Sequence, residues 1–325
     1  MSRLRVNILS GIDEVAKAEN NLPMPLRVFQ RAEWLSITGD NLVAGICYDD
    51  QNQIKGYLPL VQTKKFGIKG YHIPPYTPYF GPVIYEEDIL KKSEIIETLI
   101  KPFAKSGHLD FVIRPSDKDI VNFSRLGFTI EASQTHIIDV NQGYGLSNIH
   151  GSKRRYVKKL LELERSGKFI IKKGKEAVED LKKLNIETEE RAGFKGNREV
   201  LSKLLNQFAS EETVFVICSE DQQPLAGAFC PRDERYAYHV INASVRHKDS
   251  LLDKTNLLSA YKMAESAISG GRSFDFEGSN IPGVAAFYRM MGGVPEINFR
   301  MMKSGSIIMS LLRSAVKIKK ERYEF

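Results

Sequence analysis

The chain contains one short pattern twice, and this repeat limits what it can fold into. The stretch "AGICYDDQNQIKGYLPL" at 44–60 and the stretch "VFVICSEDQQPLAGAF" at 214–229 align without a gap. The alignment pairs Ile46 with Ile217, Cys47 with Cys218, and Gly56 with Gly227. Each stretch is typical of a strand, a polar turn and a return strand. A chain that carries the same hairpin twice is expected to hold two copies of one fold.

The elements after each hairpin also repeat in order. Each copy is expected to continue with a helix that ends at glycine, then a strand, a short helix and a closing strand. These segments are 89–107, 108–115, 119–128 and 129–140 in the first copy, and 251–271, 272–279, 283–293 and 297–302 in the second. The second copy adds a strand at 235–244. This alternation predicts a mixed α/β sheet in each copy.

The expected boundary between the copies is the glycine-rich polar stretch at 141–152. It predicts an N-terminal domain at 1–145 and a C-terminal domain at 146–325. A chain of 325 residues is long enough to bury two cores.

Cysteine use and hydropathy narrow the class of protein. The three cysteines, Cys47, Cys218 and Cys230, are too few and too scattered for a disulfide framework or a zinc site. No metal is expected, and the thiols fit a reducing compartment. The sequence "MSRLRVNILS" lacks the apolar core of a signal peptide, and no apolar run approaches the ~18 residues of a membrane span. We therefore expect a cytoplasmic protein without stable membrane insertion.

Several motifs resemble one family. The stretches "FSRLGF" at 123–128 and "FYRMMGG" at 287–293 resemble the closing element of GNAT N-acyltransferases. Two such domains, with a basic helix opening the second, resemble the FemAB family and its BioF2-like relatives. The stretches "FQRAEW" at 29–34, "SKRRYVKK" at 152–159 and "FDFEGS" at 274–279 are similar to motifs of that family. The resemblance implies two tandem GNAT-like domains that transfer acyl or aminoacyl groups to amines.

The candidate catalytic residues lie in the second copy. The resemblance places Tyr288 where GNAT enzymes often carry the acid that protonates the leaving group, and a phenol is protonated at neutral pH. The first copy has Phe123 at the matching position, so chemistry is expected in the second. The alternative is that Tyr288 only packs its short helix.

Two acids and a histidine complete this set. Asp275 and Glu277 alternate along the predicted strand, which would put both on one face to accept a proton from an amine or to cap the next loop. On the neighbouring strand, His239 follows Tyr238 and is either a base poised near neutral pH or a structural residue.

The donor site departs from the acetyl-CoA pattern. Where GNAT enzymes carry a glycine-rich loop that holds pyrophosphate, this chain reads "SVRHKDSLLDKTN" at 244–256, without glycine. FemAB-type proteins also lack that loop and take their acyl group from aminoacyl-tRNA. The absence therefore favours aminoacyl-tRNA over acyl-CoA or another acyl thioester as the donor.

Positive charge is concentrated at the start of the second copy, in a chain whose net charge is +7. The segment 150–175 is rich in lysine and arginine, and on a helix its apolar residues would form a separate stripe. The candidate tRNA- or anion-binding residues are Lys153, Arg154, Arg155 and Lys158. The alternative is a solvated charged face. The basic tail at 310–325 either touches nucleic acid or a membrane surface, or caps the domain.

The acceptor site is the least defined. The candidate substrate-binding residues are Gln30, Trp34, Tyr79, Arg114, Tyr238, Asn256 and Arg289. Tyr79 belongs to the rigid aromatic loop "HIPPYTPYFGP" at 72–82, which could form the wall of a ligand site. Thr38 and Arg114 replace a lysine and an acid of the cell-wall FemAB enzymes, so a nucleotide-muramoyl peptide acceptor is not expected.

The sequence thus predicts a FemAB-like acyl- or aminoacyltransferase that forms an amide on an amine-bearing small molecule or peptide. No permanently bound cofactor is expected, because the acyl donor, aminoacyl-tRNA or acyl-CoA, is a co-substrate. The alternatives are an N-acyltransferase that uses an acyl thioester, and a non-catalytic tandem module that binds RNA or another anion.

Overall fold

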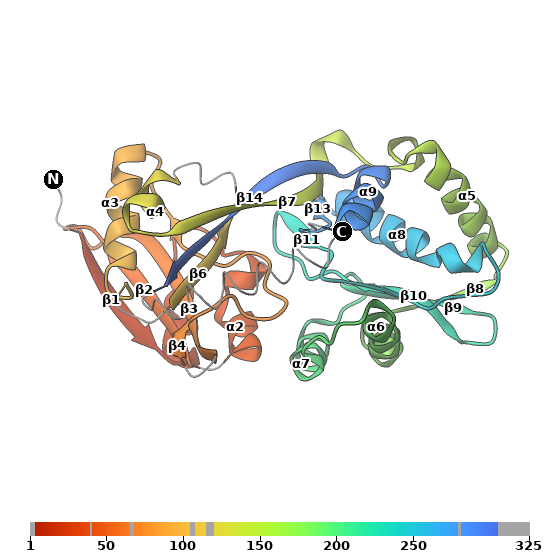
Figure 1. Ribbon diagram of the computed structural model, residues 1–325, viewed down its shortest axis with the longest axis horizontal. Coiled ribbons are helices and arrows are strands. Elements are labelled where there is room, and N and C mark those ends of the chain that lie inside the picture. The colour runs from red at the N-terminus through yellow and green to blue at the C-terminus, as the bar shows by residue number, and fades with distance from the viewer. Residues whose placement is uncertain are drawn as a thin grey trace. The chain divides into compact units, whose positions relative to one another are not determined.

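The computed structural model describes residues 4–39, 41–65, 68–104, 108–114, 120–278 and 281–304 (Figure 1). The chain divides into two compact units. The first contains Met1–Ala132 together with the chain from Asn298 onward, and the second contains Ser133–Ile297. The expected basic tail at 310–325 lies outside the described residues. Among the helices that the structure describes, none is both long and apolar enough to cross a membrane.

The first unit is a mixed sheet with short helices. Its elements are β1 (Arg5–Ser10), α1 (Ile12–Glu19), α2 (Ala32–Thr38), β2 (Leu42–Tyr48), β3 (Ile54–Lys65), β4 (Ile68–Tyr71), β5 (Val83–Ile84), α3 (Ile89–Ile100), β6 (His108–Ile113) and α4 (Val121–Arg125). The strand order is β1-β2-β3-β4-β6-β14, where β14 is Val294–Ser304. Asp88 caps α3 by accepting the backbone N–H groups of Leu90 and Lys91, and the apolar stripe of this helix is buried.

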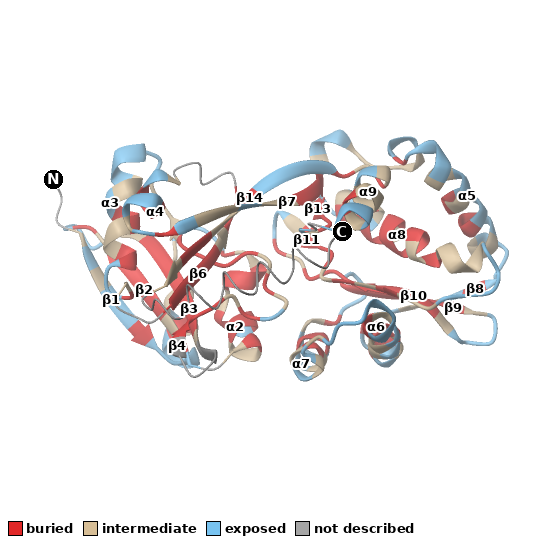
Figure 2. Cartoon of the chain, viewed as in Figure 1, coloured by how far each residue is buried: buried red, intermediate tan, exposed pale blue. Residues whose placement is uncertain are grey.

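The second unit has helices on both faces of its four-stranded sheet (Figure 1). Its strands are β7 (Thr129–Ile138), β8 (Phe169–Lys173), β9 (Val214–Ser219), β10 (Pro224–Phe229), β11 (Tyr236–Tyr238), β12 (Ile241–Ser244) and β13 (Ser273–Asp275). Its helices are α5 (Gly151–Arg165), α6 (Val178–Ala192), α7 (Arg198–Phe208), α8 (Thr255–Ser269) and α9 (Pro282–Met290). The sheet order is β12-β10-β9-β8, while in the other sheet β13 pairs with β7 on one side and with β11 on the other. Figure 2 shows buried residues along the strands and exposed residues on the outer sides of the helices.

The duplicated hairpin is present, but the alignment without a gap is one residue out of step. In each turn one residue has a positive φ, which is 61° at Asn52 and 59° at Gln222. With these two residues superposed the strand registers agree, since Cys47 pairs with Gly56 and Ile217 with Ala226. Cys47 therefore corresponds to Ile217 and not to Cys218. On a strand, a shift of one residue exchanges the two faces, so the apparent sequence matches are not structural equivalents.

The closing strand of each copy belongs to the other unit. In β7, Ile137 and Ile138 pair with β13 of the second unit. In β14, the segment from Phe299 to Ser304 pairs antiparallel with β6 of the first unit. The units therefore differ from the division at 145/146 that the sequence suggested. The physical reason is that the antiparallel partner of β6 is β14, a strand far away in the sequence. The order of elements along the chain does not predict this pairing.

Candidate active site

A strand that the sequence predicts as continuous is broken at His239. Before the break, β11 runs parallel to β13, with Tyr238 opposite Asp275. After it, β12 pairs antiparallel with β10. The backbone N–H of His239 still donates to the carbonyl oxygen of Asp275 at 2.8 Å. The chain therefore passes at this point from β11, an end strand of one sheet, to β12, an end strand of the other, and the side chains beside the break define the candidate site.

Asp275 and Glu277 do not share a strand face, contrary to the expectation. β13 ends at Asp275, and Glu277 has a φ of 64°, in the left-handed region. Asp275 is fully buried, and its Oδ1 accepts the hydroxyl of Thr135 at 2.6 Å and the backbone N–H of Glu277 at 2.8 Å. This carboxylate holds the turn, whereas Glu277 is only half-buried. The geometry therefore separates a fully buried positioning acid from a partly exposed one.

Tyr288 lies on α9 and faces the same point. Its ring stacks on that of Phe276, with 4.7 Å between centroids and 23° between the planes. Burial raises the pKa of the Tyr288 phenol above its usual value, and the carboxylates of Glu277 and Asp275 raise it further. Tyr288 therefore keeps its proton at neutral pH and can donate it to a strongly basic leaving group.

Of the two alternatives for His239, its burial and packing favour the structural residue over the base. Its ring packs against Phe274 and Phe276, at 5.4 and 5.8 Å between centroids. Among the described residues neither ring nitrogen has a hydrogen-bond partner, and burial lowers the pKa of His239 to about 3. The imidazole is neutral at physiological pH and acts as an apolar packing group.

A second histidine, which sequence reasoning missed, lies beside Tyr288. His136 on β7 is fully buried, and its ring centroid lies 5.7 Å from that of Tyr288. The backbone of Gly293 also lies close, since a Cβ atom built on Gly293 would be 2.9 Å from the Cβ of His136. Burial lowers the pKa of His136, Arg289 lowers it further, and Asp275 opposes the shift. Since β7 belongs to the first copy in sequence, only the exchange of closing strands brings His136 here.

A cationic pocket of about 210 Å³ opens between the end of β12 and the start of α8. Its lining residues are Lys153, Arg191, Ser244, Val245, Arg246, Asp253, Lys254, Asn256, Leu257 and Phe287. Asp253 pairs with Lys254 at 2.9 Å and with Arg246 at 3.5 Å, so one acid offsets part of the positive charge. Lys153 and Asn256, both sequence candidates, line this pocket. Phe287, the neighbour of Tyr288, forms part of its wall.

The other basic candidates on α5 divide into two groups. Arg154 donates from Nε and Nη2 to the carbonyl of Ile149, at 3.0 and 2.8 Å, and from Nη2 to that of Ser147 at 3.0 Å. These bonds fix the segment before α5 and engage Nε and Nη2 of Arg154, so this side chain has a structural role in addition to the expected one in phosphate binding. Arg155 and Lys158 are exposed and remain available to an anionic partner.

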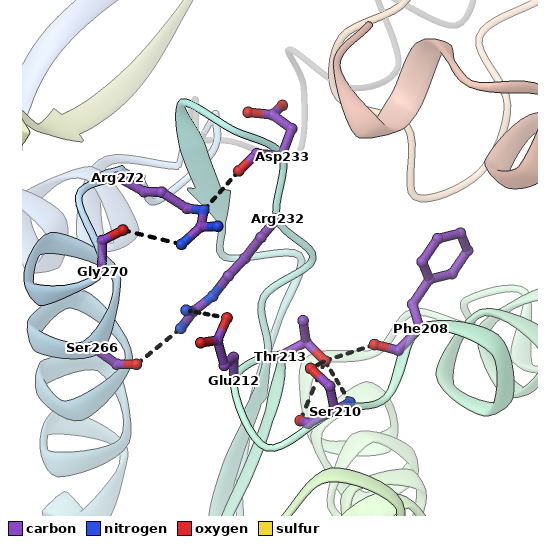
Figure 3. A network of polar contacts seen from close by, with 9 residues as sticks. All are labelled: Phe208, Ser210, Glu212, Thr213, Arg232, Asp233, Ser266, Gly270 and Arg272. Atoms are coloured by element: carbon purple, nitrogen blue, oxygen red, sulfur yellow. Dashed lines mark hydrogen bonds and ion pairs between the residues drawn. The ribbon is translucent and has the colours of Figure 1, made fainter. Parts of the chain in front are cut away.

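A polar network holds the loop that precedes β11 (Figure 3). Arg232 donates to Glu212 at 3.1 Å and to the hydroxyl of Ser266 on α8 at 3.0 Å. Arg272 donates to the carbonyl of Asp233 at 2.7 Å and to that of Gly270 at 3.1 Å. The network ties this loop to the end of α8, which fixes the register of β11 and hence the position of the strand break.

The remaining candidates occupy several places. Arg289 is exposed on α9, and Tyr238 is buried, donating its hydroxyl to Asp233 at 2.6 Å. In the first unit, Gln30 donates to the carbonyl of Gly81 at 3.2 Å, and Trp34 donates to the hydroxyl of Thr77 at 3.1 Å.

Trp34 has no exposed surface, and its ring packs edge-on against Phe29. It is a core residue in this structure, as Tyr238 is. Arg114 and Tyr79 do lie together, since the Arg114 guanidinium is 4.1 Å from the Tyr79 ring centroid. Both are buried, and Asn298 donates to the Tyr79 hydroxyl at 3.4 Å.

Comparison with known proteins supports the fold. No family model and no curated protein matches the sequence. Among solved structures, FemX has a TM-score of 0.64 at 13% identity, covering 89% of this chain and 95% of that one. L-PGS from Bacillus licheniformis has a TM-score of 0.54 at 13% identity, covering 93% and 94%. A tandem GNAT protein from the clavulanic acid biosynthesis pathway has a TM-score of 0.52 at 9% identity, covering 93% and 99%. The predicted mixed α/β, tandem GNAT-like fold is thus confirmed.

Proposed function

We propose that this protein is an N-acyltransferase that forms an amide on an amine acceptor, with its chemistry in the second unit. The observation that carries the proposal is the break between β11 and β12, beside which half-buried Glu277 lies near enough to Tyr288 for its carboxylate to raise the pKa of that phenol. The cationic pocket belongs to the same unit and reaches Phe287, next to Tyr288 along α9. The similarity to acyltransferase folds is consistent with this reading and does not by itself carry it.

The residues at the candidate site account for the bonds and protons of the acyl transfer. The acceptor amine attacks the carbonyl carbon of the donor ester, so a C–N bond forms and the C–O bond to the donor hydroxyl breaks. Glu277 takes the proton that the amine loses, and Tyr288 gives a proton to the departing oxygen. Asp275 does not exchange protons but fixes the Glu277 backbone through its hydrogen bond. Most of the rate then comes from holding donor and amine together.

We propose aminoacyl-tRNA as the donor. The cationic pocket and the exposed Arg155, Lys158 and Lys159 on α5 offer positive charge over more surface than a single phosphate needs. The segment 244–256, which has no glycine where acetyl-CoA enzymes hold pyrophosphate, also favours this donor over acyl-CoA. The acceptor is an amine-bearing small molecule or peptide.

Filter binding of aminoacyl-tRNA at several salt concentrations tests the donor without knowledge of the acceptor. The logarithm of the association constant should fall linearly with log salt, with each lost phosphate contact reducing the slope by about 0.7–0.9. The double change Arg155→Ala and Lys158→Ala should reduce both affinity and slope. Lys203→Ala is the matched control, because its ammonium pairs with Glu199 on exposed α7 at 2.7 Å. If neither salt nor the Arg155→Ala and Lys158→Ala double change alters the association constant, aminoacyl-tRNA is ruled out as the donor.

A thioester donor is the second candidate, and the small volume of the cationic pocket favours it. A pocket of about 210 Å³ beside the start of α8 suits a compact phosphate group. Millimolar CoA should then raise the Tm, and Arg246→Ala should abolish that rise. If CoA gives no rise while tRNA binds, the thioester reading is excluded.

A further inference from the structure

The first unit contains a cluster of three metal-ligand side chains that the proposed acyl transfer does not use. His72, His108 and Asp110 are all buried, at 8, 0 and 2% exposure. One potential ligand atom from each lies within 4.8 Å of the others. The Nε2 atom of His108 is 3.8 Å from Oδ2 of Asp110. Two imidazoles and a carboxylate form a ligand set typical of first-row divalent metals.

The topology of the unit explains how these residues meet. His108 and Asp110 alternate along β6, so their side chains share one face of the strand. His72 directly follows β4, which runs parallel to β6 with Tyr71 opposite Leu109. The backbone of β4 approaches closely, since a Cβ atom on Gly70 would lie 2.6 Å from the Cβ of His108. The end of β4 and the start of β6 thus place the two histidines side by side.

Arg300 on β14 orients the carboxylate. Its Nε and Nη2 donate to Oδ1 and Oδ2 of Asp110, at 2.9 and 2.6 Å. Both carboxylate oxygens thus face one guanidinium, which is the bidentate geometry in which an arginine meets a carboxylate. A metal-bound carboxylate that is also hydrogen-bonded by an outer residue is the usual arrangement in protein metal sites.

We propose that His72, His108 and Asp110 bind one first-row divalent transition metal, such as Zn²⁺. Zinc bonds of about 2.0–2.2 Å require ligand atoms roughly 3.3 Å apart, so the cluster must contract on binding. The two imidazole rings are stacked, 4.3 Å between centroids and 27° between planes, and one ring must turn to aim its nitrogen at the metal. Three protein ligands leave the fourth position to water.

The metal would fasten β6 to the loop at 72–82. This loop carries Thr77, which accepts the indole N–H of Trp34, and Tyr79, which contacts Arg114. Metal loss would therefore loosen the aromatic loop without touching Glu277 or Tyr288. Metal binding at this cluster does not depend on the proposed acyl transfer, and each is tested by its own experiment.

Titration of the chelator-treated full chain with Co²⁺, a spectroscopic substitute for Zn²⁺, tests the site. We expect visible absorption that saturates at one equivalent and is displaced by Zn²⁺, and a Tm that rises with Zn²⁺ concentration. His108→Ala should weaken binding at least about 100-fold, since even outer partners of metal ligands cost 10–100-fold. His247→Ala, which removes an exposed histidine, should bind like the parent chain.

If His108→Ala does not fold, His72→Gln at the start of the loop replaces it in the titration. No absorption and no Tm rise at millimolar metal would overturn the proposal. So would binding that His72→Gln leaves unchanged but His247→Ala removes, since that result would assign the metal to the surface.

Discussion

Thr135 donates its hydroxyl proton to the carboxylate of Asp275 at 2.6 Å, although 140 residues separate the two along the chain. Thr135 lies on the closing strand of the first copy, and Asp275 on the central strand of the second. The same carboxylate oxygen accepts the backbone N–H of Glu277. The exchanged strand β7 thus reaches the backbone that positions the proposed base, and His136, one residue further along β7, contacts Tyr288.

Replacement of Thr135 by valine should destabilise the protein. Valine preserves the shape but leaves a buried carboxylate with one hydrogen bond fewer, at an expected cost of about 1–3 kcal/mol in the free energy of unfolding. Urea denaturation measures this loss. Thr98→Val on the outer side of α3, where the hydroxyl donates to the Glu94 carbonyl of its own helix, should change stability by less than about 0.5 kcal/mol. Equal effects at both positions would contradict the role of Thr135.

Removal of the Tyr288 hydroxyl should slow transfer without unfolding the protein. Tyr288→Phe keeps the stacked ring, so we expect a Tm close to that of the parent chain and a rate lower by about 10²–10⁴. Tyr261→Phe is the matched control, since that hydroxyl bonds Glu265 on the same helix at 2.7 Å. If both variants keep the parent rate, Tyr288 is a packing residue.

Buried His239 makes stability depend on pH in a defined window. Its pKa is about 3 in the folded chain and about 6.5 when unfolded, so the unfolded state binds the proton first as pH falls. The free energy of unfolding should be fully retained above pH ~6.5 and decline below it, by up to about 1.4 kcal/mol per pH unit. The lowered pKa of His136 acts in the same direction.

Urea unfolding between pH 6.5 and 5 isolates this contribution from most carboxylates. His239→Gln should show a shallower decline than the parent chain, while His150→Gln, at an exposed helix cap, should not. Identical slopes in the parent and His239→Gln would show that the ring is protonated in the folded state.

The exchange of closing strands predicts that neither sequence half is a complete folding unit. A fragment 1–145 lacks the strand that covers β6, and a fragment 146–325 lacks β7, the partner of β13. Each alone should aggregate or lose near-UV circular dichroism, because an unpaired strand edge and its apolar face stay exposed. Co-expressed, the two should copurify as one complex. Two well-folded, independent fragments would refute the exchange.

Much of the fold can be read from the sequence, because local patterns decide it. The hairpin at 44–60, the end of α8 before Gly270 and the apolar stripe of α5 all rest on neighbours in the chain, whereas α3 ends at Ile100, before the predicted glycine. The placement of β14 beside β6 does not, since a closing strand has the same alternating pattern whichever sheet it enters.

The candidate site was predictable only in part. Tyr288 and Glu277 follow from a local motif, whereas the left-handed backbone of Glu277 and the break at His239 depend on strand pairing. His136 and the cluster of His72, His108 and Asp110 carry no spacing motif, because each is assembled by contacts between distant strands. Burial, which sets the pKa of His239, is likewise a property of the whole unit.

Transfer of a labelled aminoacyl group from aminoacyl-tRNA to a panel of primary amines (lysine, ethanolamine and glucosamine) tests the central claim most directly. The parent chain should form a labelled amide with at least one amine, and Glu277→Gln should reduce the rate by about 10²–10⁴ with its tRNA affinity intact. The same panel with acetyl-CoA covers the thioester donor. Amide formation that Glu277→Gln and Tyr288→Phe leave at the parent rate would contradict the account, and tRNA binding without any transfer would favour a non-catalytic module.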